Sequence, residues 1–547
     1  MQATVKAAKN MKEAYDVVII GSGFGGAITG CRLAEAGYSV CILERGKHYK
    51  KGEFPREFDN PRDWFWNSKL DFNGLIDFRF YNDVAAMLSS GVGGGSLIYA
   101  NVHIRAHENI FKQGWPRDIN RDVLNPYYDK VAEMLHVSPV PEYKNLPKTE
   151  AMRKVAEEIG KGNDWGKPDL AIYWGEETVE QEDPYGFGID IAQTGCRYCG
   201  ECVIGCNYYA KNTLDLNYIP VAVKNGAECF PLHEVSKIAS EGKGYNVCYR
   251  DLDKNIEGMV FGEKVIVAAG SLGSTELLLR CKKQYKTLPK LSQKLGDNFS
   301  GNGDFLAAAL NTKGEFADLQ PRNGPTVTSF IKYWKQYPEF YLEEGGIPLD
   351  ELVFVAGALR PDSDYLKKLK LSILRRIFPG LVFRSRSKKL FSEKIAEKGK
   401  LPSDMMVFLA MGRDAADGQI RLKRLFPLPF FPPKLAIRWR NKQSLPLFDK
   451  IIEEQNKVAE GLKGEQVLSP LWELRKQSTT VHLLGGCPMG DSLDTGVVNQ
   501  YGEVFDYPNL YVADGSIIPT AIGPNPAMTI GALAERIAEQ IIKKGME

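Results

Sequence analysis

Four cysteines in the middle of the chain have a spacing that suits iron–sulfur chemistry. Cys196, Cys199, Cys202 and Cys206 follow the pattern C-x-x-C-x-x-C-x-x-x-C. A short loop of this kind can surround an Fe–S cube with thiolates. Four thiolates also suit a tetrahedral zinc ion. The sequence therefore predicts an Fe–S cluster at these cysteines, with zinc or four unliganded thiols as the alternatives.

A glycine-rich turn near the N-terminus is typical of dinucleotide binding. Gly21, Gly23 and Gly26 stand at G-x-G-x-x-G spacing after the buried strand predicted over residues 16–20. The first glycine permits a tight turn, the second lets a pyrophosphate approach the backbone, and the third lets helix and strand pack closely. Glu44 ends a second predicted strand, where an acid accepts hydrogen bonds from an adenosine ribose. This order of elements predicts a bound dinucleotide.

The elements that would position these groups recur as in a doubly wound α/β sheet. Residues 89–102 combine four glycines with a strand, which indicates backbone pressed against a flat or charged ligand. Residues 258–269 predict a further strand. A helix is predicted over 274–280, with Ser271 or Ser274 as its cap.

Two C-terminal segments complete a family resemblance. Residues 481–490 read VHLLGGCPMG, and residues 523–529 read GPNPAMT. With GSGFGG, GVGGGS, VIVAAGSLGSTELLL and LYVADGSIIP, they resemble the glucose-methanol-choline (GMC) flavin oxidoreductases, in particular their bacterial cholesterol-oxidase-like branch. The cysteine motif is ferredoxin-like, although Asn207 replaces the proline that follows the fourth cysteine in bacterial ferredoxins. The resemblance implies an α/β, Rossmann-like FAD-binding domain and a second, substrate-binding α+β domain that contains an antiparallel sheet.

The resemblance also implies roles for individual residues. His482 and Asn525 match the family's active-site pair: His482 would take the hydroxyl proton, and Asn525 would fix the substrate oxygen or the flavin edge. The positions that match FAD-binding residues are Gly21, Gly23, Phe24, Gly25, Gly26, Glu44, Arg45, Gly93, Gly94, Gly95, Ser96, Asn101, Val235, Ala269, Gly270, Asp514, Gly515, Asn525 and Pro526.

Two departures limit the resemblance. Cholesterol oxidases have an asparagine just after the GGGSL turn, whereas this chain has Tyr99, with Asn101 two residues later. The extra glutamate that those enzymes use to isomerise a steroid double bond has its nearest counterpart around Ser403 and Asp404. The resemblance therefore does not extend to steroid isomerisation.

The predicted domains are discontinuous. The FAD-binding domain is predicted over residues 12–110, 200–300 and 478–547. The substrate-binding domain is predicted over 111–199 and 301–477, and the cysteine-cluster loop (196–206) and a basic apolar segment (366–400) are assigned to it.

Charge and hydropathy suggest a cytoplasmic protein. The 70 Lys and Arg nearly balance the 68 Asp and Glu, which gives no reason to expect a nucleic-acid partner. No apolar run is long enough to span a bilayer, and no apolar signal region precedes the first strand. Residues 366–400 carry twelve Lys or Arg among apolar side chains and only two acids. This pattern favours peripheral contact with the inner face of the membrane, and a solvated loop is the alternative.

Together these features predict the oxidation of a hydrophobic alcohol, such as a sterol or long-chain alcohol, by hydride transfer to flavin N5 of bound FAD. An Fe–S cluster would pass the electrons singly to an external quinone, cytochrome or ferredoxin. Without a cluster, O2 would be the acceptor. A fatty-acid-acting flavoenzyme and a non-catalytic electron-transfer flavoprotein are the alternatives, because fold alone does not settle function.

Overall fold

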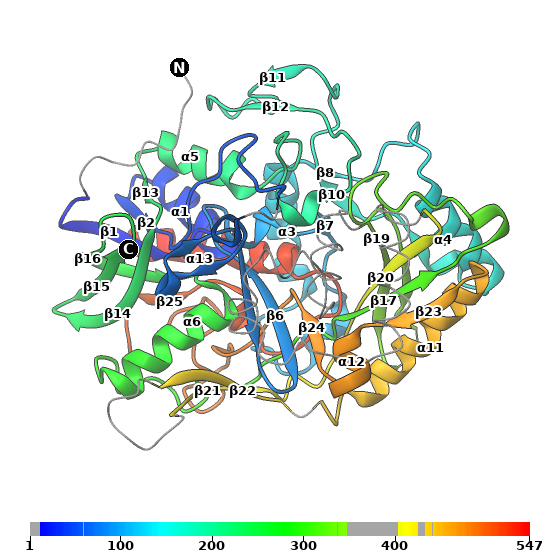
Figure 1. Ribbon diagram of the computed structural model, residues 1–547. Helices are drawn as coiled ribbons and strands as arrows, with labels where there is room; N and C mark the ends of the chain where they lie inside the picture. Colours follow the sequence, from blue (N-terminus) through cyan, green and yellow to red (C-terminus); the bar gives the residue numbers. More distant parts are fainter. Residues whose placement is uncertain are drawn as a thin grey trace.

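A seven-stranded sheet carries the N-terminal glycine turn (Figure 1). The computed structural model describes residues 11–57, 60–335, 337–346, 403–424, 433–439 and 441–546. The strand order is β13 (Glu228–Phe230), β2 (Val40–Leu43), β1 (Ala14–Ile20), β16 (Ile256–Val267), β15 (Gly244–Asp251) and β14 (His233–Glu241), and β25 (Leu510–Val512) also pairs with β16. All pairs are parallel except those that β15 makes with β14 and β16. Helix α1 (Phe24–Glu35) packs against α5 (Tyr218–Lys224) and α13 (Ala527–Met546). The predicted Rossmann-like α/β unit is confirmed.

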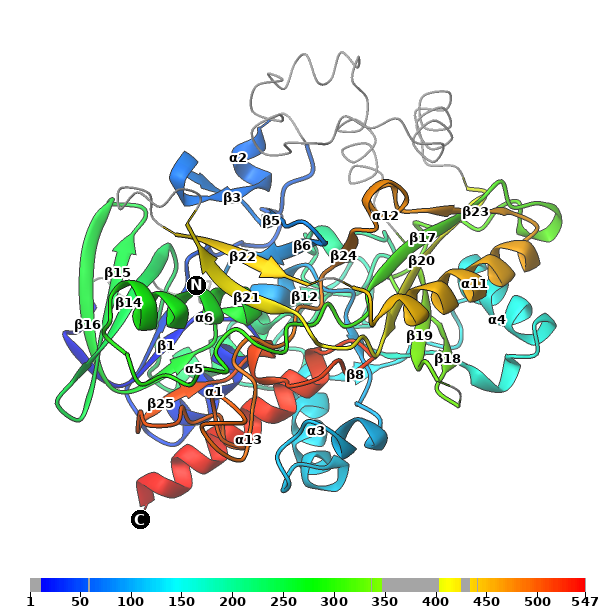
Figure 2. The same ribbon diagram turned by 90° about the horizontal axis from the view of Figure 1, so that it is seen from below.

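A six-stranded antiparallel sheet forms the second part of the molecule (Figure 2). Its order is β23 (Glu465–Leu468), β17 (Phe305–Leu310), β20 (Met405–Gly412), β19 (Phe340–Gly345), β18 (Phe330–Tyr333) and β9 (Trp165–Gly166). Side chains of alternate residues, such as Phe305, Leu342 and Phe408, form one core with Met152 of α4 (Pro147–Glu158) and Phe448 of α11 (Leu445–Gly461). The predicted α+β unit with an antiparallel sheet is therefore confirmed, whereas the exact domain boundaries stay a prediction.

Smaller elements connect these sheets. They are α2 (Pro61–Trp64), β3 (Trp66–Asn67), β4 (Phe72–Asn73), β5 (Ile76–Phe80), β6 (Val84–Ser89), β7 (Val102–His103), α3 (Arg121–Leu135), β8 (Val137–Ser138), β10 (Asp169–Ala171), β11 (Glu180–Glu182), β12 (Ala192–Thr194), α6 (Gly270–Leu279), β21 (Gln419–Lys423), β22 (Lys434–Arg438), α12 (Pro470–Arg475) and β24 (Ser478–Thr480). Within the described ranges, no helix is both long enough and apolar enough to cross a bilayer. The basic segment 366–400 lies outside the described residues.

Helix α6 corrects one prediction. It begins at Gly270 rather than at Ser274, and neither predicted serine caps it. Ser271 Oγ donates to the Gly485 carbonyl oxygen at 2.7 Å, and Ser274 Oγ donates to the Asp514 carboxylate. The cap prediction was wrong because both hydroxyls have tertiary partners that local sequence does not reveal.

The turn between β1 and α1 is enclosed by backbone from two later strands. A Cβ on Gly21, which has φ +97°, would lie 2.4 Å from the Ala268 carbonyl oxygen just after β16. A Cβ on Gly25 would lie 1.3 Å from the Ala513 carbonyl oxygen just after β25. At Gly23, in contrast, the nearest atom would be 4.0 Å away. Glycine is therefore a packing requirement at Gly25 but not at Gly23.

We expect Gly25→Ala to destabilise the fold by at least about 3 kcal/mol, because the methyl group must displace main chain. Gly23→Ala is the matched control in the same turn, and after removal of flavin from every sample it should unfold close to the temperature of the wild-type apoprotein. Thermal unfolding of both variants followed by circular dichroism checks this, and equal melting temperatures for the two would contradict it.

Candidate active site and cysteine cavity

Two glycine turns meet where the resemblance places FAD. A Cβ on Gly94 would lie 2.6 Å from Cα of Gly23, so the backbones touch. Ser22 Oγ accepts a hydrogen bond from Gly93 N at 3.0 Å and links the turns. A Cβ on Gly95 would meet nothing within 4 Å, which leaves open space along the second turn. Exposed backbone beside open space fits a bound FAD.

The residues at the end of β2 have different surroundings. Glu44 Oε2 accepts hydrogen bonds from Ser22 N at 3.0 Å and Ser22 Oγ at 2.7 Å, which ties the predicted ribose acid to the first turn. Arg45 is turned toward Asp77, at 3.0 Å, and its guanidinium stacks over Trp66. The structure therefore places Glu44 at the glycine turn, whereas the guanidinium of Arg45 is bound by Asp77 and Trp66.

Three other residues predicted to bind FAD lie on separate elements: Ser96 in the second glycine turn, Phe24 at the start of α1 and Val235 on β14. Ser96 Oγ donates to the Gly93 carbonyl oxygen at 2.8 Å and stabilises the second turn. Phe24 packs edge-on against Tyr99, with ring centroids 5.6 Å apart. Val235 is a partly buried residue of β14.

Asp514 connects the first turn to the segment that carries His482. Its Oδ2 accepts a hydrogen bond from Gly270 N at 2.9 Å, directly after Ala269. Burial raises the pKa of Asp514. The next residue, Gly515, accepts a hydrogen bond from Gly485 N at 3.0 Å. Since Gly25 abuts Ala513, the glycine turn and the His482 segment meet along residues 513–515.

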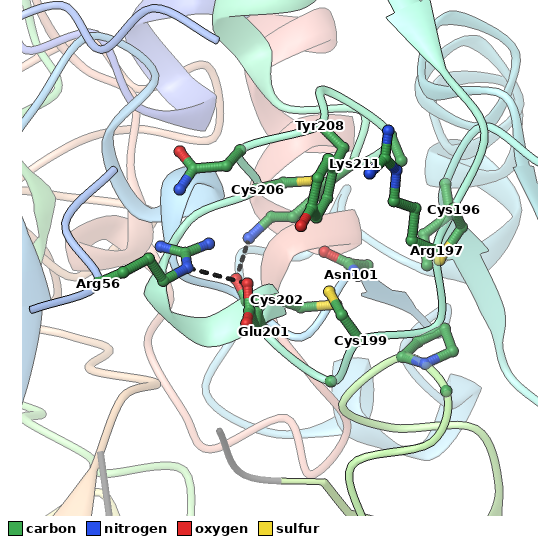
Figure 3. Close-up of a pocket in the computed structure, with 16 residues that line it drawn as sticks. Arg56, Asn101, Cys196, Arg197, Cys199, Glu201, Cys202, Cys206, Tyr208 and Lys211 are labelled. Atoms are coloured by element: carbon green, nitrogen blue, oxygen red, sulfur yellow. Dashed lines mark hydrogen bonds and ion pairs between the residues drawn. The ribbon is translucent and has the colours of Figure 1, made fainter. Parts of the chain in front are cut away.

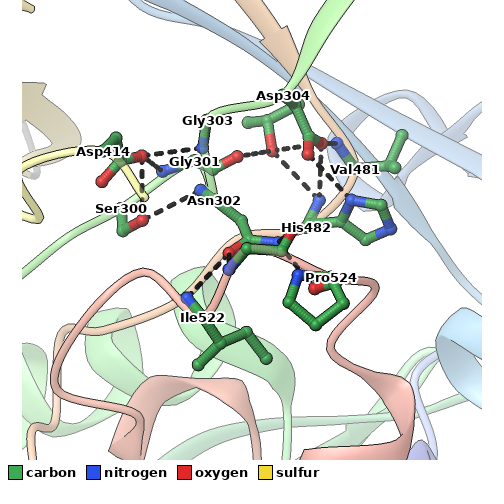
Figure 4. A network of polar contacts seen from close by, with 12 residues as sticks. Ser300, Gly301, Asn302, Gly303, Asp304, Asp414, Val481, His482, Ile522 and Pro524 are labelled. Carbon is green, nitrogen blue, oxygen red and sulfur yellow. Dashed lines mark hydrogen bonds and ion pairs between the residues drawn. The ribbon is translucent and has the colours of Figure 1, made fainter. Parts of the chain in front are cut away.

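His482 forms a dyad with a buried carboxylate (Figure 4). Its Nδ1 lies 2.8 Å from Oδ1 of Asp304, whose side chain is 1% exposed. A carboxylate acceptor places the proton on Nδ1 and leaves Nε2 as the basic nitrogen. Asp304 Oδ2 accepts further hydrogen bonds from Val481 N and Thr480 Oγ1, both at 2.9 Å. Sequence reasoning missed Asp304, because it lies 178 positions from His482 and belongs to no recognised motif.

Asn302, two residues before Asp304, holds the loop that leads to Asn525. Its Oδ1 accepts from Ile522 N at 3.0 Å and Gly523 N at 2.9 Å, and its Nδ2 donates to the Pro524 carbonyl oxygen at 3.0 Å. Asn525 Oδ1 is buried and has no hydrogen-bond partner among the described residues. Pro526 follows, and its carbonyl accepts from Ile530 N in the first turn of α13. The amide of Asn525 is thus fixed in place with an acceptor left unpaired.

The carboxylate of Asp414 binds the segment that leads into β17. Asp414 Oδ2 accepts hydrogen bonds from Ser300 Oγ at 2.9 Å, Gly303 N at 3.0 Å and Gly301 N at 3.1 Å. Burial raises the pKa of Asp414 to about 6, while these donors lower it.

One row of the six-stranded sheet faces away from α4 and α11. Leu306, Leu409, Glu343 and Phe330 lie opposite one another on β17, β20, β19 and β18. Side chains opposite one another in a sheet share a face. The three apolar members are only partly buried, unlike the core residues that alternate with them. This face therefore offers an apolar wall interrupted by a single carboxyl group.

Glu343 is an acid that sequence reasoning did not place. It is fully buried, and neither carboxyl oxygen has a hydrogen-bond partner among the described residues. Burial raises the pKa of Glu343 well above its usual value, although the nearby Asn525 amide lowers it. Ser403 and Asp404, the predicted counterparts, lie instead beyond the Met405–Leu310 end of the β20–β17 pair. That end is a whole strand, about 17–20 Å, from Asp304.

The four cysteines of the predicted cluster line one cavity (Figure 3). Gly200 and Gly205 in this loop have positive φ values of +72° and +87°, a backbone conformation that glycine adopts without strain. In the part of the chain that the structure describes, no group of three or more His, Cys, Asp or Glu side chains is placed so that it could hold a metal ion. Burial raises the pKa of Cys196, and it raises that of Cys199 to about 12.

Cations and an amide complete the cavity wall. Arg56 and Lys211 line it with the cysteines, and Arg56 Nε donates to Glu201 at 2.9 Å. Asn101, which is predicted to contact FAD, lines this cavity. Its backbone has φ +65°, and both polar atoms of its buried side chain are unpaired among the described residues.

Comparisons with known proteins match this arrangement. Two family models described as GMC oxidoreductase match the chain, one over residues 15–169 and 185–299 and the other over residues 414–534. A cholesterol oxidase of Acinetobacter baumannii is 30% identical over 97% of this chain and 95% of its own length. A cholesterol oxidase of Mycobacterium tuberculosis is 29% identical over 98% of this chain and 92% of its own. The solved structure of pyridoxine 4-oxidase from Mesorbium loti aligns with a TM-score of 0.62 at 16% identity, covering 96% of this chain and 98% of that one, and so shares the fold.

The buried carboxyl of Glu343 predicts a pH-dependent stability. Burial raises the pKa of Glu343 in the folded protein, so above about pH 4.3 its carboxyl group loses its proton more readily in the unfolded chain. The free energy of unfolding therefore falls with increasing pH, by up to about 1.4 kcal/mol per pH unit. Glu343→Gln should reduce this slope by up to about 1.4 kcal/mol per pH unit, whereas the exposed Glu465→Gln on the same sheet should leave it unchanged. Denaturant unfolding between about pH 5 and pH 8 measures both slopes. A Glu343→Gln slope equal to that of the wild type would show that Glu343 is ionised in the fold.

Proposed function

Because this chain belongs to the GMC oxidoreductase family and is an oxidoreductase of CH–OH groups, we propose that it oxidises a lipophilic alcohol, such as a sterol or a long-chain alcohol, to a carbonyl. FAD, when bound, supplies the hydride acceptor. The observation that carries the proposal is the His482–Asp304 dyad, in which Asp304 directly precedes β17, a strand of the sheet with the partly buried apolar row. Cholesterol oxidase relatives, which match nearly the whole chain, support an alcohol of this class.

The chain's own residues would hold the cofactor and move the proton. Gly23, Gly93, Gly94 and Gly95 present backbone to FAD, and Glu44 lies at the ribose end. The alcohol gives its hydroxyl proton to Nε2 of His482, while Asp304 holds the ring and stabilises the cation that forms.

The remaining site residues would bind and orient the substrate. The side-chain N–H group of Asn525 would donate a hydrogen bond to the substrate oxygen. Asn302 holds the loop that leads to Asn525, which keeps this residue in position. Leu306, Phe330 and Leu409 exclude water and pack against the hydrocarbon part of the substrate. Burial favours the neutral form of Glu343, which would add a polar contact to this apolar wall.

We further propose that the cysteine cavity holds an Fe–S cluster. Such a cluster, when bound, supplies one-electron transfer to an external acceptor such as a quinone, cytochrome or ferredoxin. Four thiols that line a single cavity support this assignment. A tetrahedral zinc ion held by the same four thiolates is the alternative.

The dyad proposal is tested by anaerobic flavin reduction. With cholesterol and 1-hexadecanol as probes, His482→Ala should slow reduction by about 10²- to 10⁴-fold, because the base is lost. Asp304→Asn should also slow it, since an amide cannot replace both acceptor oxygens of the carboxylate. Flavin absorbance of each variant serves as the control for cofactor content. Wild-type rates in His482→Ala would remove the assignment, and a wild-type enzyme reduced by no alcohol would overturn the proposed function.

The cluster is tested by assaying iron and acid-labile sulfide in anaerobically purified protein. The wild type should contain both, and Cys202→Ser should lose most of its iron. Cys248→Ser, a partly buried cysteine outside the cavity, is the matched control and should keep the wild-type content. Absence of iron and sulfide from the wild type would leave an oxygen-using alcohol oxidase as the function.

A further inference from the structure

The side chain of Lys211 is buried between the cysteine loop and the second glycine turn. It is 2% exposed, and its Nζ donates to the carbonyl oxygens of Cys202 at 2.7 Å and of Leu97 and Tyr99 at 2.9 Å each. Leu97 ends the short helix Gly94–Leu97, the turn that would lie along the flavin. One ammonium group therefore joins the cysteine cavity to the turn at the proposed hydride-transfer site.

The charge of this ammonium has no close counterion. Its three partners are neutral carbonyls, and in the part of the chain that the structure describes no carboxylate forms an ion pair with it. Asp215, itself 1% exposed, acts on Lys211 only at longer range. An ammonium buried without an anion costs several kcal/mol. Such a cost is offset when an anionic group occupies the adjacent cavity, and a cluster held by four thiolates carries net negative charge.

A second buried group points to the same occupant. Asn101 is fully buried, its amide lies in the cavity wall beside Cys199 and Cys202, and neither its Oδ1 nor its Nδ2 has a partner among the described residues (Figure 3). Buried amides are normally hydrogen-bonded. An N–H donor aimed at sulfide or thiolate sulfur would satisfy the Asn101 amide.

We propose that Lys211 is the positioning residue of the cysteine cavity: its buried ammonium anchors the loop to the flavin-side turn and stabilises the electron-loaded cluster. This rests on the Fe–S cluster proposed above. A bound cluster would pass the two electrons of the reduced flavin one at a time to the external acceptor, while Lys211 keeps its proton and is neither oxidised nor reduced. A positive charge favours the more negative, reduced cluster, and the low dielectric of the interior preserves this attraction.

The test is an EPR-monitored redox titration of the anaerobic holoenzyme. Lys211→Met should make cluster reduction at least tenfold less favourable, a shift of about 59 mV to more negative potential for a one-electron couple. Arg197→Met is the matched control, because Arg197 lines the same cavity but is exposed. Water and salt screen its charge, so the shift should be much smaller and should fade at high ionic strength.

The outcomes separate this inference from the cluster itself. A cluster whose potential is the same in Lys211→Met and Arg197→Met overturns the role of Lys211 and leaves the cluster in place. Wild-type protein without iron overturns both. Should Lys211→Met fail to hold iron, Lys211→Arg decides, because it keeps the charge: it must hold iron near the wild-type potential, and loss of iron there too overturns the electrostatic role.

Discussion

The carboxylate of Asp304 accepts hydrogen bonds from three consecutive residues, Thr480, Val481 and His482, and so joins the start of β17 to the end of β24. This contact fixes the orientation of the His482 imidazole. The same short segment holds further loops: Asn302 binds the turn before Asn525, and Ser300 meets Asp414. The segment 300–304 thus aligns the side chains at the candidate site.

Buried polar groups in this protein fall into two kinds. Asp304 and Asp414 are surrounded by donors, so they hold backbone segments together. Glu343, Asn525 and Asn101 are as deeply buried, yet each has polar atoms without partners among the described residues. Because an unpaired buried polar group costs free energy, such groups are expected where a ligand completes them. Their placement at the apolar sheet face and in the cysteine cavity agrees with the two proposed binding locations.

The second glycine turn stands between these two locations. Gly94 in this turn contacts Gly23 of the first turn. The carbonyl oxygen of Leu97, at the end of the turn, accepts a hydrogen bond from Lys211, which lines the cysteine cavity. In the proposed enzyme, two-electron chemistry at the flavin and one-electron exit through the cysteine cavity would share this short piece of backbone. Such an arrangement would separate the apolar substrate wall from the route of the electrons.

The sequence by itself determined the local features: the glycine turn, the strands and helices around it, the spacing of the four cysteines, and the family. These depend on residues close together in the chain, where spacing and backbone conformation carry the information. Only the tertiary structure showed that Asp304 bonds to His482, that Glu343 is a buried acid in the middle of the six-stranded sheet, and that Asn101 lines the cysteine cavity. It also moved the start of α6 to Gly270, since the serines have distant partners. Each of these contacts depends on which segments of the chain lie side by side. Residues that are far apart in the chain show no spacing or local pattern that would reveal their contact.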